Sequence, residues 1–355
     1  MNLDSLQINK GSPVLVTGAT GYVAGQLIKS LLGLGLTVHA AVRDPDNAEK
    51  LKYLNLLAQE LEGEIKYFKS DLLEQGSYFD AMQGCEVVFH TASPFTMSVS
   101  DPENDLVRPA KQGTRNVLES VNKTPSVKRV VLTSSCAAIY GDNIDVNNTP
   151  NGKFTEQVWN TSSTLEHNPY SYSKTVAERE AWDMAKQQSH WQLVVINPSL
   201  VIGPGINPYA TSESFNIIKQ MGNGTMKAGA PRWGMGVVDV RDLAVAHVKA
   251  AFLPDAEGRH IISAHSTNFF EMAKVLLPQF GDNYPLPKKA LPKWMVWLLG
   301  PMMDKSMTRK LISNNVNVEF VADNSKGIEK LGMSYRPLKE SMTDFFQQMI
   351  DNKQI

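Results

Sequence analysis

The sequence predicts an α/β fold: a Rossmann-type doubly wound parallel sheet with a smaller, mostly C-terminal α+β portion that binds substrate. Three observations lead to this prediction. Short runs rich in β-branched residues alternate with helix-like segments through the first half of the chain, which is typical of a parallel sheet covered by helices on both faces. A glycine-rich turn joins the first strand to the first helix. After Pro198 strands become sparse, and glycine and proline cluster instead.

The elements follow in a regular order. Residues 13–17 are predicted as the first strand and residues 22–32 as the helix after it. The other predicted strands are residues 36–42, 65–69, 87–90, 127–133 and 192–196, and the other long helices are residues 106–121 and 170–186. Residues 236–239 and 259–263 are short strand-like runs that either rejoin the sheet or flank it.

Composition excludes several classes of protein. The chain has 355 residues, with 35 basic and 36 acidic side chains, so it lacks the basic balance of a nucleic-acid-binding protein. Cys85 and Cys136 are its only cysteines, too few for a disulfide framework or a cysteine-based zinc site. Residues 1–11 hold no apolar run, unlike a secretory signal. We therefore expect a cytoplasmic protein with no metal, no nucleic acid and no membrane among its partners.

The turn between the first strand and helix has the spacing of a nucleotide-binding loop. Gly18, Gly21 and Ala24 follow the pattern G-x-x-G-x-x-A. Glycine there permits a tight turn and lets a pyrophosphate approach the amide groups at the helix N-terminus. Simple turn glycines are the alternative, but the strand–turn–helix context favours a nucleotide. The predicted contacts from this loop are Thr17, Gly18, Thr20, Gly21, Tyr22 and Val23.

The end of the second strand indicates which dinucleotide binds. Arg43 comes where the adenosine ribose is expected, and a guanidinium pairs with the 2′-phosphate of NADP, whereas NAD sites place a carboxylate there. Asp44 leaves NAD open, because it takes that place if the strand ends one residue later. Asp71 and Leu72 follow the third strand and are predicted to flank the adenine, with a helix N-cap as the other role for Asp71.

A tyrosine and a lysine four residues apart suggest acid–base chemistry. Tyr170 and Lys174 share one face of the helix predicted at 170–186. A nearby ammonium group lowers a tyrosine pKa from about 10 and makes the hydroxyl a usable acid. A solvated helix face is the alternative for such a pair in isolation. Thr133, Ser134 and Ser135 end the fifth strand, where doubly wound sheets bind ligands, and Ser135 is predicted to polarise a substrate carbonyl together with Tyr170.

These residues together resemble the extended short-chain dehydrogenase/reductase superfamily, in its dihydroflavonol reductase and cinnamoyl-CoA reductase-like branch. The resemblance covers nearly the whole chain. The residues that carry it are 14–24, 41–45, 88–94, 133–135, 170 with 174, 197–204, 237–244, 323–326 and 331–332. It implies an NADPH-dependent carbonyl reductase in which Ser135 polarises the carbonyl and Tyr170 is the general acid. Lys174 would lower the tyrosine pKa and hold the nicotinamide ribose, and Ser134 would serve structure alone.

The resemblance also implies further contacts. Those to the cofactor are Thr91, Ala92, Ser93, Tyr170, Lys174, Pro198, Ser199, Leu200 and Val201, and those to the substrate are Phe95, Tyr140, Met226 and Trp233. Two departures narrow the substrate. Residues 167–172 differ from the Lys-Asn-Trp-Tyr-Cys-Tyr of cinnamoyl-CoA reductases, and Tyr140 replaces the asparagine with which flavonoid reductases grip a catechol ring. A broader reductase of aldehydes and ketones is the remaining expectation. Met226, Trp233 and Met235 lie where the family closes its pocket, which suggests an apolar or aromatic substrate, and a packed core is an equal alternative for these three residues.

The expected division of the chain follows from these assignments. Residues 1–200, completed by roughly 236–265, are predicted as the NADP(H)-binding Rossmann domain, and residues 201–235 and 266–355 as the substrate-binding portion. Two other functions stay open: an NAD-dependent nucleotide-sugar epimerase/dehydratase or hydroxysteroid dehydrogenase, and an NADP-sensing regulator without activity. The run at 294–299, flanked by Lys288, Lys289 and Lys293, is compatible with a membrane surface, but its short length favours an ordinary buried helix.

Overall fold

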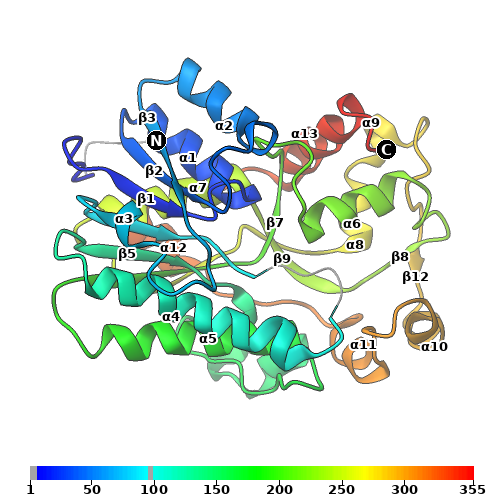
Figure 1. The fold of residues 1–355 in the computed structure, drawn as a ribbon. Coiled ribbons are helices and arrows are strands. Elements are labelled where there is room, and N and C mark those ends of the chain that lie inside the picture. The colour runs from blue at the N-terminus through cyan, green and yellow to red at the C-terminus, as the bar shows by residue number, and fades with distance from the viewer. Residues whose placement is uncertain (1–5, 95–98) are drawn as a thin grey trace.

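The computed structural model describes residues 6–94 and 99–355. In this part of the chain the main sheet has seven parallel strands in the order β10-β6-β5-β4-β1-β2-β3 (Figure 1). The strands are β1 (Val14–Thr17), β2 (Thr37–Val42), β3 (Glu64–Lys69), β4 (Val87–His90), β5 (Arg129–Thr133), β6 (Gln192–Pro198) and β10 (Gly258–Ile262). The order reverses between β1 and β4, so the predicted doubly wound fold is confirmed.

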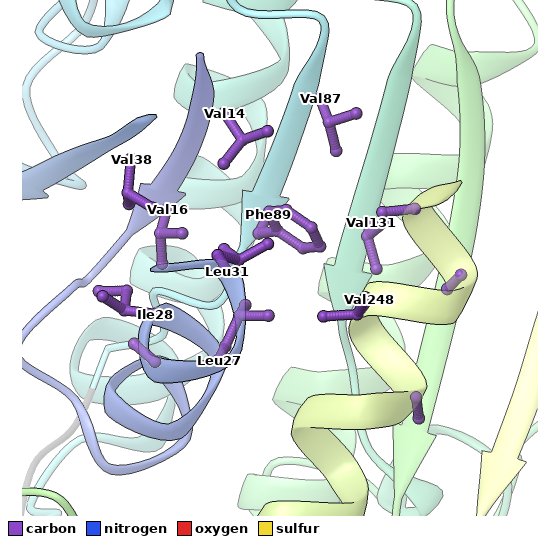
Figure 2. Packing of buried hydrophobic residues seen from close by; sticks show 14 of the residues in the cluster. Val14, Val16, Leu27, Ile28, Leu31, Val38, Val87, Phe89, Val131 and Val248 are labelled. Carbon is purple, nitrogen blue, oxygen red and sulfur yellow. The ribbon is translucent and has the colours of Figure 1, made fainter. Parts of the chain in front are cut away.

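The first strand is buried on both faces, as its apolar sequence requires. Val14 and Val16 belong to the core on one face of the sheet, whereas Leu15 belongs to the core on the other, because successive side chains of a strand alternate. Figure 2 shows the first of these cores, with Leu27 and Val248 closing over the strands. The helices that cover this face are α1 (Tyr22–Gly33), α2 (Ala48–Glu60) and α7 (Val240–Phe252).

The opposite face is covered by α3 (Phe79–Met82), α4 (Arg108–Asn122) and α5 (Pro169–Ala185) (Figure 1). The helix predicted at 106–121 begins earlier than expected, because a π-helical turn over Glu103–Val107 runs directly into α4. α4 and α5 lie side by side along the sheet. As a result, α5 brings its N-terminal turn to the carboxyl edge of the sheet.

The second half of the chain forms smaller sheets beside the carboxyl edge. One contains β7 (Leu200–Ile202), β9 (Gly234–Asp239) and β11 (His265–Asn268), and another pairs β8 (Ala230–Pro231) with β12 (Ala290–Leu291). Of the two strand-like runs left open by the sequence, the one at 259–263 rejoins the main sheet as β10, while the one at 236–239 flanks it as part of β9. The other helices are α6 (Glu213–Gly222), α8 (Phe269–Lys274), α9 (Leu277–Phe280), α10 (Lys293–Met303), α11 (Arg309–Asn315), α12 (Ser325–Leu331) and α13 (Leu338–Asp351).

The core of this second half joins α6, α8 and α13. Ile218, Met272, Phe345 and Phe346 are buried together there. Tyr22 of α1 packs against the same core, with its ring 5.3 Å from Phe215 and 6.3 Å from Phe345. The first helix of the nucleotide-binding half is therefore in direct contact with the second half.

The expectation that residues 294–299 form a buried helix is wrong. They lie in α10, where Val296 and Gly300 are buried and most other side chains are exposed. Among the described residues, the buried side of α10 packs through Val296 against Ile312 and Val316. Helix length and apolarity predict burial only on average, and here a single short partner helix, α11, covers too little of the surface.

Two features are absent from the described residues, 6–94 and 99–355: a membrane-spanning helix and a metal-binding cluster. No helix there is long and apolar enough to cross a lipid bilayer. No group of three or more His, Cys, Asp or Glu side chains there lies close enough together to hold a metal ion. Cys85 and Cys136 are buried and free, and burial raises the pKa of the Cys85 thiol to about 12.

Candidate functional site

The turn after β1 contains the glycines predicted to bind a nucleotide. Gly18 has φ +62°, and a Cβ there would lie 3.0 Å from the Ala92 backbone, so the turn requires glycine. Gly21 begins α1 with no side chain capping the first amides and no acidic residue in the first turn. The partial positive charge of this helix end is thus available to an anion. These features fit the pyrophosphate of a dinucleotide.

Two of the predicted loop residues have side chains engaged elsewhere. The Thr17 hydroxyl is buried and accepts hydrogen bonds from the amides of Thr91 at 3.1 Å and Ala92 at 3.0 Å. Thr17 therefore fixes the loop after β4 against the loop after β1. The Tyr22 hydroxyl donates to the carbonyl of Gly203 at 2.5 Å. The side-chain hydroxyls of Thr17 and Tyr22 are therefore used in internal hydrogen bonds. Thr20 and Gly21 are exposed, and Val23 is half-buried.

Arg43 is the first residue after β2, because the strand ends at Val42. Its side chain is exposed. Asp44 is less suited to hold a ribose, since its carboxylate accepts a hydrogen bond from the Asp46 amide at 3.1 Å within its own turn. The position and availability of the guanidinium fit a 2′-phosphate.

The loop after β3 adjoins Arg43. Asp71 and Arg43 both act on the buried Tyr78, whose pKa burial raises above 10, with Asp71 raising it further and Arg43 lowering it. The Asp71 carboxylate accepts from the Leu73 amide at 2.8 Å, and this forms a turn where an N-cap was the alternative. Leu72 packs against the position of Gly113. Asp71 and Leu72 thus lie at the same edge of the sheet as Arg43.

The two serines after β5 have different environments. Ser134 is buried, and its hydroxyl donates to Glu178 at 2.5 Å. Ser135 is half-buried, and its hydroxyl accepts from the Ala137 amide at 3.1 Å, which begins a short 3-10 helix at Cys136–Ala138. The Ser135 proton is not used in that bond. This arrangement fits a structural role for Ser134 and leaves Ser135 able to donate to a ligand.

Tyr170 and Lys174 lie in the first two turns of α5. Tyr170 is 52% exposed, and the Lys174 Nζ atom lies 5.7 Å from the centre of its ring. Lys174 also donates to the Ser93 hydroxyl at 2.9 Å. The structure thereby brings the predicted acid, its lysine and the loop after β4 together. A narrow pocket beside Lys174 is lined by Ala92, Ser93, Pro94, Thr133 and Ser134.

His90 lies beneath this cluster. Burial, reinforced by the positive charge of Lys174, lowers its pKa to about 3. Its Nδ1 atom is 3.0 Å from the Thr17 hydroxyl. The ring is therefore neutral and structural, as a buried strand residue is expected to be.

Glu178 is a residue that sequence reasoning missed. Besides Ser134, its carboxylate accepts from Arg259 Nε at 2.6 Å and from the Asn197 amide at 2.7 Å. Asn197 also donates to the carbonyl of Ser135 at 3.1 Å. This buried cluster joins the ends of β5, β6 and β10 to α5. The signal was present, because Glu178 follows Tyr170 and Lys174 at further four-residue spacing on the same helix face.

A second missed cluster lies just before α5. His167 Nε2 is 2.7 Å from the Asp142 carboxylate, which also accepts from Asn314 and Asn315 of α11, each at 2.7 Å. These partners are 172 and 173 residues from Asp142 along the chain, so no local pattern indicates them. The cluster ties α11 to the segment that leads into Tyr170.

The segment after β6 passes close to the same edge. Pro198 ends β6 and is buried, and the Ser199 amide donates to Ile262 at 3.2 Å. Leu200 and Val201 belong to β7 and are half-buried. The strand switch from β6 to β7 thus runs along the carboxyl edge, where the nicotinamide is predicted.

The predicted substrate residues are not gathered in one place. Tyr140 stacks on Phe154 at 4.7 Å, and burial raises its pKa well above 10, so its ring belongs to a packed aromatic cluster. Met226 packs against the core of α6 and α13, whereas Trp233 pairs with Val316 beside α11. Phe95 lies outside the described residues.

A wider groove than the one beside Lys174 lies elsewhere, at the amino ends of the strands. It has a volume of about 410 Å³, and Val14, Val87, Arg129 and Gln192 line it. Each of these is the first residue of its strand. Open α/β sheets bind ligands at their carboxyl edge, so the cluster around Lys174 is the better candidate despite its narrower pocket.

The fold and this cluster define a dinucleotide-binding protein with a tyrosine–lysine pair at the carboxyl edge of its sheet. Residues 14–263 match the model of the NAD dependent epimerase/dehydratase family. The chain belongs to this family, the extended short-chain dehydrogenases/reductases, within the dihydroflavonol reductase and cinnamoyl-CoA reductase-like branch. The resemblance predicted from the sequence is confirmed, and so is the enzyme class, oxidoreductase.

Individual relatives extend this match over the whole chain. Cinnamoyl-CoA reductase CAD2 of Medicago truncatula is 34% identical over 97% of this chain and 98% of its own length. Anthocyanidin reductase of Arabidopsis thaliana is 37% identical over 78% of this chain and 85% of its own. The crystal structure of yeast methylglyoxal/isovaleraldehyde reductase Gre2 complexed with NADPH superposes with a TM-score of 0.77 at 25% identity, covering 97% of this chain and 100% of that one.

Proposed function

We propose that the protein uses NADPH to reduce an apolar or aromatic aldehyde or ketone to an alcohol. The observation that carries this proposal is the convergence of Tyr170, Lys174 and Ser93 at the carboxyl edge, with Lys174 2.9 Å from Ser93. NADPH is the cofactor, in keeping with the exposed guanidinium of Arg43 after β2 and with the NADPH complexes of Gre2. The relatives named as reductases of cinnamoyl-CoA and anthocyanidin support an aromatic substrate, and the methylglyoxal/isovaleraldehyde reductase Gre2 supports an aldehyde or ketone.

When bound, NADPH supplies the hydride that reduces the carbonyl carbon. Ser135 donates a hydrogen bond to the carbonyl oxygen and polarises it. Tyr170 then donates its hydroxyl proton to that oxygen as negative charge develops there. The Lys174 ammonium stabilises the phenolate left on Tyr170 and would hold the nicotinamide ribose of the bound cofactor. Ser134, bonded to Glu178, keeps the strand end in place without touching the substrate.

An NAD-dependent epimerase or dehydratase of nucleotide sugars is less favoured. Such an enzyme needs a carboxylate for the ribose at the end of β2, whereas the residue that directly follows this strand is Arg43. A regulator that only senses NADP does not need Ser135, Tyr170 and Lys174 in one place. Purified protein that carries bound NAD and does not oxidise NADPH would favour the epimerase.

The direct test follows the absorbance of NADPH with a panel of aldehydes and ketones. We expect turnover with at least the aromatic members. Tyr170→Phe should lower kcat by about 10²- to 10⁴-fold, the usual contribution of a general acid, while leaving the Kd for NADPH within about twofold. Full activity in Tyr170→Phe would show that the acid is misassigned.

The neighbouring serines provide a matched pair. Ser135→Ala removes the donor to the carbonyl oxygen and should lower kcat by about 10²-fold. Ser134→Ala removes only the buried bond to Glu178 and should mainly lower stability, by about 1–3 kcal/mol. If Ser134→Ala lost more activity than Ser135→Ala at equal fold content, the two roles would have to be exchanged.

A further inference from the structure

Helix α10 exposes an unusual amount of apolar surface. Among the described residues, fourteen large hydrophobic side chains are exposed, and six of them lie on this one helix. They are Trp294, Trp297, Leu298, Leu299, Met302 and Met303. Trp294 is 65% exposed and Met302 81%. Contiguous apolar surface of this kind marks an interaction site in a folded protein.

Basic residues flank the helix on both sides along the chain. Residues 288–310 contain six cations and one acid, Asp304, in a chain whose net charge is -1. The cations are Lys288, Lys289, Lys293, Lys305, Arg309 and Lys310. All but Lys293 are exposed, and within the part of the chain that the structure describes none of the six forms an ion pair. We call residues 288–310 the α10 surface.

The cations are held close to the apolar side chains by the local fold. The Arg309 guanidinium lies 4.5 Å from the ring centre of Trp297. Lys293 donates to the carbonyl of Ser313 at 2.7 Å, across to the end of α11. Val296 and Ile312 pack between the two helices. The tryptophans and the charges therefore belong to one structural unit, which stands at the side of the molecule away from the main sheet (Figure 1).

We propose that the α10 surface docks the protein onto the surface of an anionic lipid bilayer. Apolar side chains with tryptophan, next to lysine and arginine, are what an interfacial helix presents to lipid headgroups and acyl chains. The helix would lie in the plane of the interface. Its eleven residues are too few to span a bilayer, which takes about 20.

Charge favours a bilayer over a second copy of the chain. In a symmetric dimer the same patch meets itself, so six cations and one acid would face an identical set. Like charges at such close range oppose association. An anionic leaflet offers the complementary sign, and each cation near it strengthens binding about fivefold.

Docking would bring the candidate active site close to the lipid. Asn314 and Asn315 of α11 both donate to Asp142, which also bonds His167, three residues before Tyr170. Trp233, a predicted substrate residue, pairs with Val316 directly after α11. The statement that the active site comes close to the lipid rests on the proposed function, whereas the proposed docking does not.

The test is co-sedimentation of the full chain with vesicles. We expect binding to vesicles of phosphatidylcholine with about one third phosphatidylserine, weak binding to phosphatidylcholine alone, and release by salt at about 0.5 M. Equal binding to both vesicle types, or none to either, would overturn the proposal.

Variants locate the surface. The double change Leu298→Glu and Met302→Glu should weaken binding by tenfold or more, about the effect of losing one buried leucine. Ile328→Glu, at an exposed apolar residue of α12, is the matched control and should leave binding unchanged. The triple change Lys288→Ala, Lys289→Ala and Lys305→Ala should weaken binding about fivefold per cation, unlike alanine at the exposed Lys50, Lys52 and Lys66.

Two further measurements separate the possible occupants. Brominated lipids should quench the protein fluorescence, and Trp294→Phe with Trp297→Phe should remove most of that quenching. Sedimentation equilibrium without lipid should give a monomer. A dimer that Leu298→Glu and Met302→Glu dissociate would show instead that a second copy covers the α10 surface. NADPH oxidation with a water-soluble aldehyde should be unchanged in these variants, so failure of docking is distinguishable from failure of the proposed reaction.

Discussion

The carboxyl edge of the main sheet and the α10 surface depart from ordinary burial in opposite directions. At the edge, Glu178 and Arg259 are charged and buried, yet their hydrogen bonds are satisfied. On α10, Trp294 and Met303 are apolar and exposed, at 65% and 79%. Burying charge is costly unless it is paired, and exposing apolar surface is costly unless a partner covers it. Both regions therefore indicate function, the first an internal site and the second an external partner.

The largest effect is expected at the buried charge. Glu178→Ala leaves the Arg259 guanidinium without its carboxylate, and this should lower the free energy of unfolding by about 3–5 kcal/mol. Urea denaturation measures it. Glu103→Ala, at an exposed pair with Arg108, is the control and should cost less than about 1 kcal/mol. If the two variants lost the same free energy of unfolding, the buried pair at the carboxyl edge would be no different from an exposed surface pair.

A smaller effect on stability is expected from a change of pH. It involves His247 of α7, next to the carboxyl edge of the main sheet. Its Nε2 atom lies 2.7 Å from the Thr133 hydroxyl, and burial lowers its pKa to about 4. The unfolded chain binds a proton near pH 6.5, where the folded chain does not. The free energy of unfolding is therefore unaffected by this group above pH 6.5. It falls as the pH drops from 6.5 toward 4, and the loss is about 2 kcal/mol at pH 5.

Denaturation at several pH values checks this expectation. The slope of the free energy of unfolding against pH, between pH 7 and pH 5, counts the protons taken up on unfolding. His247→Gln should lower this number by up to one proton, whatever its effect on stability at pH 7. His190→Gln, at an exposed histidine, serves as the control. An unchanged slope in His247→Gln would mean that this ring takes up its proton over the same pH range in the folded and the unfolded chain.

The smallest effect is expected on α10. Leu298→Ser should change the free energy of unfolding by less than about 0.5 kcal/mol, because the side chain is exposed and loses little packing. Val296→Ala, on the buried side of the same helix, should cost about 1–2 kcal/mol. A large loss of stability in Leu298→Ser would mean that the apolar surface is packed in the folded protein.

Much of the fold was predictable because its signals are local. The apolar strands, the turn at Gly18 and Gly21, and the spacing of Tyr170 to Lys174 lie within a few residues of one another. Arg43 was predicted in the same way, and it directly follows β2, which ends at Val42; its role toward the cofactor stays a prediction. The proposed roles of Ser135, Tyr170 and Lys174 await the experiments above.

The parts of the fold and of the candidate site that were not predictable depend on contacts between segments distant in the sequence. Glu178 meets Arg259, 81 residues away, and Asp142 meets Asn315, 173 residues away. The predicted substrate residues Tyr140, Met226 and Trp233 lie in three different packed clusters. No pattern within either segment indicates which distant segment will lie against it.

The sequence by itself determined the doubly wound sheet, the phosphate turn and the tyrosine–lysine pair, because periodicity and turn chemistry act over a few residues. Only the tertiary structure decided which polar groups are satisfied and which apolar ones stay uncovered. The 294–299 run illustrates the difference, since its composition fits a buried helix as well as an interfacial one. Its exposure was settled by how much surface α11 covers, and that is a property of the packed chain.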